Sequence, residues 1–393
     1  MKILAIETSC DETAISILTA EGDESFATFT ILGDNILSQV VLHQKYGGVY
    51  PSLAKREHAK NLVPILEQTL KDAESYMPKA SQVDEKLKQE LKLLLTREPE
   101  LFEQIIVFLE NTQKPDFDTI VVTHGPGLEP ALWVGINFAK ALSRAWNIPT
   151  IHINHMEGHI FSGLLKKTEE EKYAIEAVAF PVLALLISGG HTELVLMKNW
   201  GSYNIIGSTR DDAVGEAFDK VARLLSLPYP GGPQISKLAE EARNGNLSLE
   251  EPLPRPMLNS LNYDFSFSGL KTAVLYRVKD TVLDDALKKK IAREFEESAV
   301  EVLTKKSLRA IEEYGVQTLV IGGGVSANTY LRSELKREVE EKYPYLAFHI
   351  PEQNLTTDNA IMIGIAGYFK TLSAEYTENT DEIIAIGNLK LQQ

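Results

Sequence analysis

Two apolar strands joined by a short polar turn form a pattern that occurs twice in this sequence. The first copy runs from Ile3 to Leu18, and the second runs from Pro181 to Met197. Apolar runs of this length, bounded by turn residues, are typical of buried strands. Because further strands and helices follow each copy, the pattern predicts a duplicated α/β architecture with two lobes, mixed sheets and a central cleft. Ligands of such proteins usually bind in the cleft.

Glycine-rich turns separate further strands from helices. A strand is expected from Thr119 to Thr123, followed by a turn at Gly125-Pro126-Gly127 and a helix from Ala131 to Trp146. Later, an expected strand from Thr318 to Ile321 runs into Gly322-Gly323-Gly324. A glycine turn before a helix lets backbone N–H groups approach an anion or a nucleotide. It can equally be a tight turn that needs positive φ.

The segment from about residue 79 to residue 115 is charged and lacks a strand pattern. Its leucine spacing, interrupted at Pro99, predicts two helices inserted in the first lobe. We expect the first lobe to span residues 1–145 with this insertion, and the second lobe to span residues 146–354. The C-terminal segment, 355–393, is expected to return to the first lobe.

Composition limits the kind of protein that this chain can be. Its 393 residues are 44% hydrophobic, which is enough for a large core in two lobes. No apolar run has the length of a membrane span, and no signal-peptide pattern precedes the first strand. A single cysteine, Cys10, excludes an internal disulfide and fits a reducing compartment. We expect a cytoplasmic protein that has no membrane association.

The formal net charge of -15 argues against binding of nucleic acid by charge alone, because phosphate contacts need clustered Lys and Arg. Most short basic runs are solvated helix faces. Two local basic stretches nevertheless occur, one with His43, Lys45, Lys55, Arg56, His58 and Lys60 and the other with Lys288, Lys289, Lys290 and Arg293.

His155 and His159 are four residues apart, directly after an expected strand, Thr150 to Ile153. If a helix begins here, this spacing places both imidazoles on one face, as two neighbouring ligands of a metal ion require. The pair can also cap the helix or lie in solvent. A carboxylate from another element would favour the metal, and Asp358 is the best candidate. Its alternative role is the N-cap of a helix from Ile361 to Phe369, and the sequence leaves both roles open.

A peptidase is the weaker interpretation of the histidine pair. Zinc peptidases with such a pair place a glutamate directly after the first histidine, where it acts on metal-bound water. Here Glu157 comes two positions after His155, which turns it about 200° around the helix and away from the metal. We therefore interpret the site as a metal that binds and orients a substrate.

Several turns can together hold a nucleotide, although each has a structural alternative. Ser188-Gly189-Gly190-His191 offers bare backbone and a hydroxyl group. Asp219 can accept hydrogen bonds from a ribose or form a salt bridge. The turn from Tyr229 to Pro233 can approach a ligand or simply be rigid, and Asn328 can bond a base or cap its helix. The sequence contains no P-loop, and Ser188 lacks the flanking glycine of a nucleophile elbow.

Nine segments spread along the chain share a pattern with one known family. They are Ile6–Thr13, Tyr46–Val49, His155–His159, Ile187–Thr192, Asp211–Lys220, Tyr229–Pro233, Asp264–Thr272, Gly323–Asn328 and Thr357–Asn359. In these segments the sequence resembles the TsaD family, the metal-dependent tRNA N6-adenosine threonylcarbamoyltransferases, in the form found in bacteria and organelles. The resemblance implies a two-lobed fold of the actin/Hsp70/sugar-kinase superfamily.

Carried over by position, the resemblance implies one divalent metal ion, iron or zinc, held by His155, His159 and Asp358. It implies contacts to the substrate threonylcarbamoyl-AMP from Ile187, Ser188, Gly189, Gly190, Asp219, Gly232 and Asn328. The implied reaction transfers the threonylcarbamoyl group to N6 of the adenosine 3′ of the anticodon, in tRNAs that read codons beginning with A, and releases AMP. If the attacking amine needs a base, Asp11, Glu12 and His191 are candidates without a ranking.

The resemblance also implies partners, namely a TsaB-like paralogue and a TsaE-like ATPase, and such a partner can supply basic surface for tRNA. Two other functions stay open. One is a nucleotide-dependent carbamoyltransferase or kinase of the same superfamily that acts on a small molecule. The other is a non-catalytic binding subunit, against which the three candidate metal ligands argue. The chain departs from the family pattern in its long insertion, at Glu129-Pro130, and from Ile386 to Leu389.

Overall fold

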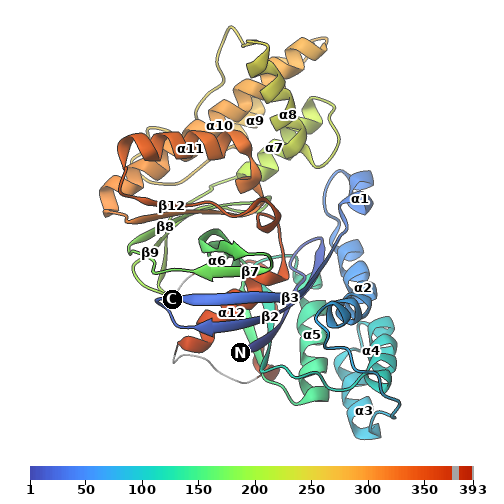
Figure 1. The fold of residues 1–393 in the computed structure, drawn as a ribbon. Coiled ribbons are helices and arrows are strands. Elements are labelled where there is room, and N and C mark those ends of the chain that lie inside the picture. Colours follow the sequence, from blue (N-terminus) through green and yellow to red (C-terminus); the bar gives the residue numbers. More distant parts are fainter. Residues whose placement is uncertain (374–379, 392–393) are drawn as a thin grey trace. The chain divides into compact units, whose positions relative to one another are not determined.

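The computed structural model describes residues 1–373 and 380–391, which form two compact α/β units (Figure 1). The first unit comprises Met1–Ala177 and Asp358–Lys390, and the second comprises Val178–Thr357 together with Leu391. Residues 146–177, which we expected in the second lobe, therefore lie in the first unit. Each unit is built around one mixed sheet.

The sheet of the first unit has seven strands in the order β5-β4-β1-β2-β3-β7-β6. Their bounds are β1 Lys2–Glu7, β2 Glu12–Gly22, β3 Ala27–Ser38, β4 Thr119–Gly125, β5 Thr150–Asn154, β6 Lys166–Glu169 and β7 Lys172–Ile175. Strands β1, β4 and β5 run parallel, whereas β1, β2 and β3 form an antiparallel meander. The first expected strand pair is thus confirmed.

Helices cover both faces of this sheet. They are α1 Val40–His43, α2 Pro51–Asp72, α3 Glu85–Leu94, α4 Pro99–Asn111, α5 Glu129–Trp146, α6 His155–Leu164 and α12 Ala360–Leu372, with short 3-10 helices η1 Gln44–Tyr46 and η4 Thr380–Glu382. Leu4 and Ile6 of β1 point into the core under α2 and α5, whereas Ala5 points to the opposite face and packs with Ala360 of α12. The two-residue period of the strand therefore buries both faces.

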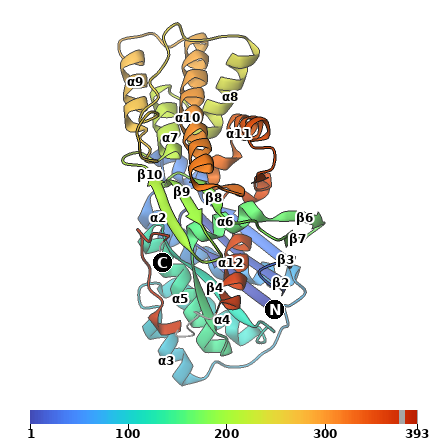
Figure 2. The same cartoon turned by 90° about the vertical axis from the view of Figure 1, so that its left-hand side faces the viewer.

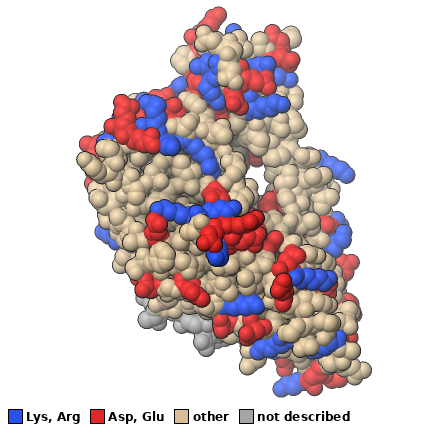
Figure 3. Space-filling view, in the orientation of Figure 1, with Lys and Arg blue, Asp and Glu red and all other residues tan. Residues whose placement is uncertain are grey.

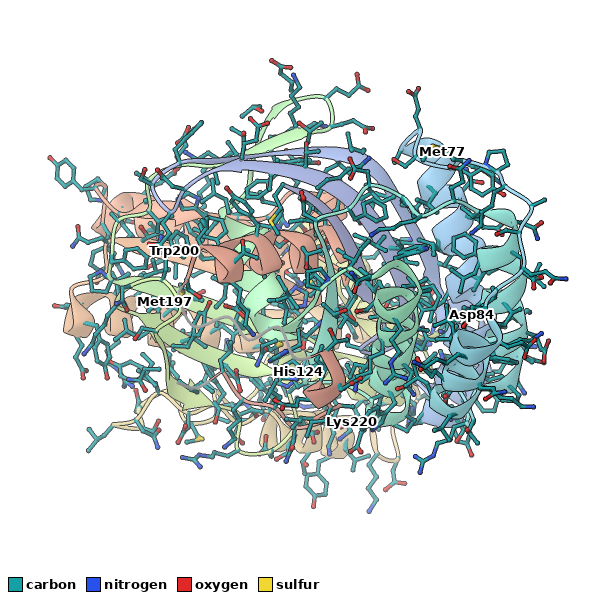
Figure 4. All side chains as sticks on the ribbon, turned by 90° about the horizontal axis from the view of Figure 1, so that it is seen from below. Met77, Asp84, His124, Met197, Trp200 and Lys220 are labelled. Carbon is teal, nitrogen blue, oxygen red and sulfur yellow. The ribbon has the colours of Figure 1, made fainter. Side chains whose placement is uncertain are left out.

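The insertion consists of two helices, as its sequence predicts. Asp84 caps α3, because its carboxylate accepts hydrogen bonds from the backbone N–H groups of Lys86 and Leu87 at 3.0 and 3.3 Å. Pro99 is the first residue of α4, where its missing N–H leaves no hydrogen bond unmade. Figure 4 labels Met77 and Asp84, which lie on the connection from α2 into this insertion.

The sheet of the second unit has five strands in the order β10-β9-β8-β11-β12. Their bounds are β8 Val182–Ile187, β9 Thr192–Met197, β10 Tyr203–Ser208, β11 Thr318–Gly322 and β12 Ala347–His349. Strands β8 and β9 are the second expected strand pair. Strands β8 and β9 pair antiparallel, and β8 pairs parallel with β11. Five consecutive strands from one edge of the first sheet, β3-β2-β1-β4-β5, have the same topology. The expected duplication is confirmed.

The helices of the second unit pack together beside this sheet (Figure 2). They are α7 Val214–Leu224, α8 Gly231–Asn244, α9 Ser268–Val278, α10 Asp285–Tyr314 and α11 Thr329–Lys342, with 3-10 helices η2 Gly324–Ala327 and η3 Gln353–Leu355. Phe218 of α7 meets Phe295 of α10 edge to face, with 4.9 Å between ring centroids. Among the residues described in both units, no helix has the length and apolar character that a bilayer span needs.

Candidate functional site

Helix α6 presents the two predicted histidines on one face. Asn154 caps this helix, since its side-chain oxygen accepts a hydrogen bond from Met156 N at 2.8 Å. His155 is therefore the first helical residue and His159 follows one turn later, with 4.7 Å between the ring centroids. The two side chains are only 8% and 0% exposed. The two histidines therefore neither cap the helix nor lie in solvent.

Asp358 completes the group, although it is more than 190 residues away in the sequence. Asn359, and not Asp358, is the N-cap of α12, because its side-chain oxygen accepts a hydrogen bond from Met362 N at 2.9 Å. The Oδ1 atom of Asp358 lies 3.3 Å from His155 Nε2 and 3.2 Å from His159 Nε2. One ligand atom from each of the three residues lies within 4.8 Å of the others.

A glycine between the two histidines allows this approach. Helices α6 and α12 pack against each other, and Gly158 faces α12. A Cβ at Gly158 would lie 2.9 Å from Ile363 Cδ1 and 3.0 Å from Met362 Cγ, which is closer than side chains normally pack. The close packing brings the start of α12, and with it Asp358, to the histidine face of α6.

Burial and charge act against each other in this group. Burial opposes ionisation of Asp358, but the charge of His155 and the hydrogen bonds from both histidines outweigh it and hold the pKa of the Asp358 carboxyl far below its usual range. Burial also opposes protonation of His155, yet Asp358 and Glu7 raise the pKa of that imidazole well above its ordinary value. For His159, burial prevails and lowers the pKa.

These three side chains fit a divalent metal ion. Two imidazoles and one carboxylate are a common set of protein ligands, and three ligands leave coordination positions for a substrate. His159 is fully buried; its Nε2 faces Asp358 Oδ1 at 3.2 Å, and its Nδ1 has no hydrogen-bond partner within the described part of the chain. When Nδ1 carries the ring proton, Nε2 has a free lone pair directed toward the carboxylate, and a metal ion between them would bind both.

Glu7, the last residue of β1, is a site residue that the sequence analysis missed. Its carboxylate is fully buried, and Oε2 lies 3.0 Å from His155 Nδ1. Thr123 Oγ1 donates to Oε2 at 2.5 Å, and Ser9 N donates to Oε1 at 2.5 Å. A carboxylate that accepts a hydrogen bond from Nδ1–H fixes the tautomer in which Nε2 is free to bind a metal. The available signal was an acidic residue directly after the apolar run Ile3–Ile6.

Two of the three candidate bases, Asp11 and Glu12, lie in the first unit at the turn from β1 to β2. Burial raises the pKa of the Asp11 carboxyl, and burial together with the charge of Asp11 raises the pKa of Glu12 well above its usual range. Ser38 Oγ donates to Glu12 Oε1 at 3.1 Å. Asp11 Oδ2 is buried without a hydrogen bond to any described residue. The third candidate, His191, lies in the second unit.

The second unit contains a cavity of about 340 Å³, a size typical of small-molecule sites. Four of the seven residues predicted to contact the nucleotide line it, namely Gly189, Asp219, Gly232 and Asn328. A Cβ at Gly189 or Gly232 would meet no atom within 4 Å, so bare backbone borders open space there. The cavity also takes in the first turns of α8 and α11, where helix N–H groups lack partners within the helix.

Asp219 and Asn328 have structural roles beside this cavity. Asp219 Oδ1 accepts a hydrogen bond from Gly231 N at 2.7 Å and so orders the start of α8. Burial raises the pKa of the Asp219 carboxyl, against the opposing effect of this hydrogen bond. Asn328 caps α11 through Leu331 N at 2.8 Å and donates to Glu296 Oε1 at 2.7 Å.

The other three predicted nucleotide contacts, Ile187, Ser188 and Gly190, are not among the residues that line this cavity. Ile187 is fully buried in the core, and its carbonyl would be 2.4 Å from a Cβ at Gly323, whose φ is 88°. Ser188 Oγ accepts hydrogen bonds from Gly190 N at 3.3 Å and from His191 N at 3.1 Å. These contacts close the turn that presents Gly189 to the cavity.

The fold resembles that of a much longer solved protein, full-length HypF in its phosphate- and nucleotide-bound form. The TM-score is 0.50 at 12% sequence identity, and the match covers 95% of this chain and 47% of that chain. At this identity the likeness concerns the fold alone. The chain is thus an α/β protein with two mixed sheets in an actin/Hsp70/sugar-kinase-like fold, and it carries a group of side chains that can bind a metal.

The sequence defines the family within this class. A family model described as TsaD, tRNA N6-adenosine threonylcarbamoyltransferase, matches residues 30–83 and 99–365. Proteins of that name from Staphylococcus aureus (strain Newman) and Bacillus cereus (strain ATCC 14579) are 40% and 41% identical over 372 and 368 residues. Both alignments cover 93% of this chain, and they cover 91% and 90% of the two relatives. The chain belongs to the TsaD family, as its motifs predicted.

Proposed function

We propose that this protein transfers the threonylcarbamoyl group of threonylcarbamoyl-AMP to N6 of the adenosine 3′ of the anticodon, in tRNAs that read codons beginning with A. Membership of the TsaD family supports the reaction type. The observation that carries our assignment of residues is the convergence of His155, His159 and Asp358 within the first unit.

We assign the adenylate part of the donor to the cavity of the second unit. The N-termini of α8 and α11 both border it, and the positive end of a helix dipole favours a phosphate. The bare backbone at Gly189 and Gly232 leaves room for a sugar or a base. Ile187, Ser188 and Gly190 would act by shaping the turn around Gly189, and Asp219 and Asn328 by bordering the bound nucleotide.

We assign one divalent metal ion, iron or zinc, to His155, His159 and Asp358. When bound, such an ion supplies a Lewis acid for a carbonyl oxygen of the threonylcarbamoyl group. The chain's own part is to hold the ligands ready. Glu7 orients His155 through Nδ1, and the packing of α6 on α12 sets Asp358 opposite both imidazoles.

The reaction forms a bond between N6 and the carbamoyl carbon and breaks the bond from that carbon to the phosphate oxygen. AMP leaves with the electron pair of the broken bond, and the amine loses one proton to a base. Asp11, Glu12 and His191 are the candidates for this base. The raised pKa of the two buried carboxyl groups supports them, because a base whose pKa is nearer neutrality accepts a proton more readily.

The proposed function also involves partner proteins. We propose that a TsaB-like paralogue and a TsaE-like ATPase assist the enzyme in the cytoplasm. The chain has 40 basic and 55 acidic residues, so its overall charge repels tRNA and a basic partner surface would offset that repulsion.

An acceptor assay tests the reaction. The full chain is supplied with tRNA, its partner proteins and threonylcarbamoyl-AMP made from labelled threonine. We expect label in the tRNA nucleoside, whereas label found only in small molecules would favour a small-molecule carbamoyltransferase or kinase.

The metal assignment has its own test. We expect His155→Ala and Asp358→Ala to lose bound metal and transfer while keeping the folded circular dichroism spectrum. Glu157→Gln, on the same helix but outside the ligand group, is the matched control and should retain both metal and transfer. Full metal content and transfer in the folded Asp358→Ala variant would refute the assignment.

A further inference from the structure

A pair of stacked tyrosines stands exposed at the turn between η1 and α2 in the first unit. Tyr46 and Tyr50 are 62% and 55% exposed, and their rings stack with 5.5 Å between centroids and 22° between planes. We call these two residues the tyrosine pair. Two exposed rings held parallel offer flat apolar surface on which another planar group can stack.

Cationic side chains are frequent in the sequence around the tyrosine pair. Residues 40–60 contain four Lys or Arg residues and one Glu, the reverse of the balance in the whole chain. Lys45 is exposed and forms no ion pair with any described residue. Arg56 and Lys60 share Glu57, at 3.6 and 3.9 Å, and their side chains are still 70% and 65% exposed. Figure 3 shows Lys and Arg side chains on the face over α1 and α2.

Buried polar side chains hold this exposed turn in place. His43 is fully buried and accepts a hydrogen bond from Tyr50 N at 3.1 Å through Nδ1. Its Nε2 lies 3.3 Å from Gln39 Oε1, and Gln39 Nε2 lies 3.5 Å from Nδ1 of the buried His58. His58 Nε2 in turn lies 3.0 Å from the carbonyl oxygen of Cys10.

The same network reaches the turn that carries the candidate bases. Cys10 immediately precedes Asp11, and Gln39 N donates a hydrogen bond to the Asp11 carbonyl at 2.9 Å. His58 Nδ1 also lies 2.8 Å from Thr13 Oγ1. The tyrosine pair is therefore fixed, through buried hydrogen bonds within one unit, relative to the segment from Cys10 to Thr13.

We propose that the tyrosine pair, with Lys45, Arg56 and Lys60, is the surface on which the anticodon loop of the tRNA docks. This inference rests on the proposed function, because it takes tRNA as the acceptor. Unpaired bases of an RNA loop stack on exposed aromatic rings, and flanking cations bind the adjacent phosphates. The His43–Gln39–His58 network then sets the docked loop in register with Asp11 and Glu12.

Charge complementarity is the reason to favour RNA over another protein as the occupant. Exposed Val41 and Leu42 adjoin the tyrosines and could also serve a protein interface. A protein partner would bury these apolar side chains, however, and would give no reason for the net positive charge of residues 40–60 or for Lys45, which is unpaired among the described residues. A phosphate backbone uses the cations and the rings together.

Binding of a tRNA substrate and of its isolated anticodon stem-loop to the full-length protein tests the proposal. We expect the double variant Tyr46→Ala/Tyr50→Ala to bind on the order of tenfold more weakly, because the bases of the loop lose the rings on which they stack. Tyr46→Phe/Tyr50→Phe should bind like the parent protein, since phenyl rings stack without the hydroxyl. Lys45→Ala should lower the slope of log Kd against log salt by about 1.

Matched variants separate this surface from general effects of charge or aromatic content. Tyr345→Ala removes a tyrosine that is 99% exposed in the second unit, and Lys167→Ala removes an exposed lysine on β6. Neither should change RNA affinity. Parent-like RNA affinity of Tyr46→Ala/Tyr50→Ala, or a defect confined to binding of a protein subunit, would overturn the docking surface.

The experiments distinguish an error in the proposed function from an error in the docking surface. If the parent protein with its partners places no threonine label in tRNA, the function itself is wrong. If the parent labels tRNA and the double alanine variant does so with an unchanged KM for tRNA, only the docking surface is wrong. AMP binding serves as the internal control, and we expect the double variant to bind AMP like the parent.

Discussion

Glu7→Gln replaces one carboxylate oxygen with an NH₂ group at a fully buried position that receives three contacts. Ser9 N–H donates to Oε1, whereas Thr123 Oγ1 and His155 Nδ1 share Oε2. A carboxylate has two acceptors and no donor, so it satisfies all three. A carboxamide has only one acceptor oxygen, and each of its two orientations therefore disturbs a different contact.

The two orientations have different measurable consequences. If the NH₂ group faces Ser9, two buried donors confront each other, and the unsatisfied N–H costs about 1–3 kcal/mol of folding stability. If it faces His155, Nδ1 must become the acceptor, and the ring proton moves to Nε2, where it blocks the metal. Loss of such an outer-sphere carboxylate weakens metal binding by about 10- to 100-fold.

Two measurements on Glu7→Gln decide between these orientations. Urea unfolding of the metal-free protein gives the stability, and titration of Zn²⁺ against a competing chelator gives the metal affinity. We expect at least one of the two to fall by the stated amount. The matched control is Glu98→Gln, a buried glutamate of the same unit whose carboxylate pairs with Lys55 at 2.8 Å and which should leave metal affinity unchanged. Unchanged stability together with unchanged metal affinity in Glu7→Gln would refute the reasoning.

Three further predictions follow from particular contacts. Asn359→Ala removes the cap of α12 and should lower the free energy of unfolding, measured in urea, by about 1 kcal/mol. Metal content should stay at the parent level, because Asp358 and not Asn359 is the proposed ligand. Loss of the metal would contradict this division of roles. Gly232→Ala should fold like the parent but bind AMP more weakly in calorimetry, because its methyl group enters open cavity space. Gly323→Ala should be less stable than the parent, since its Cβ would lie 2.4 Å from a backbone carbonyl and its φ is 88°. Equal stability of the two variants would contradict the different roles given to these two glycines. Burial lowers the pKa of His58 from 6.5 to about 4, so between these pH values the unfolded chain binds a proton that the folded chain does not. Stability should therefore fall as the pH drops below about 6.5, by up to about 1.4 kcal/mol per pH unit from this group, and His58→Gln should show a shallower dependence in unfolding experiments across that range; an identical dependence would argue against a neutral buried His58.

Local patterns were enough to predict much of the fold. The two strand pairs at Ile3–Leu18 and Pro181–Met197 were predictable because continuous apolar runs with polar turns have few other solutions. The insertion helices were predictable from leucine spacing and from Pro99, because proline is favoured at the first position of a helix. The boundary between the units was harder to place, because residues 146–177 contain their own strands and a helix and no local signal says which sheet they join.

The site was predictable in part. Spacing suggested His155 and His159, and Asp358 was the best candidate for a third ligand before the family resemblance implied the same residue. Glu7 was missed because its role depends on His155, a residue far away in the sequence whose Nδ1 it contacts. The choice between Asp358 and Asn359 as the cap of α12 also escaped the sequence, since either side chain can accept a helix N–H bond.

The amino-acid sequence by itself determined the duplicated strand pairs, the family motifs and the helical spacing of the two histidines, because each depends only on residues close together in the chain. Only the tertiary structure decided that Asp358 meets the histidines, that Glu7 orients one of them, and that two helix N-termini border one cavity. These outcomes depend on how separate elements pack. Gly158 illustrates the reason, since the absence of one Cβ lets α6 and α12 approach closely enough to bring distant ligands together.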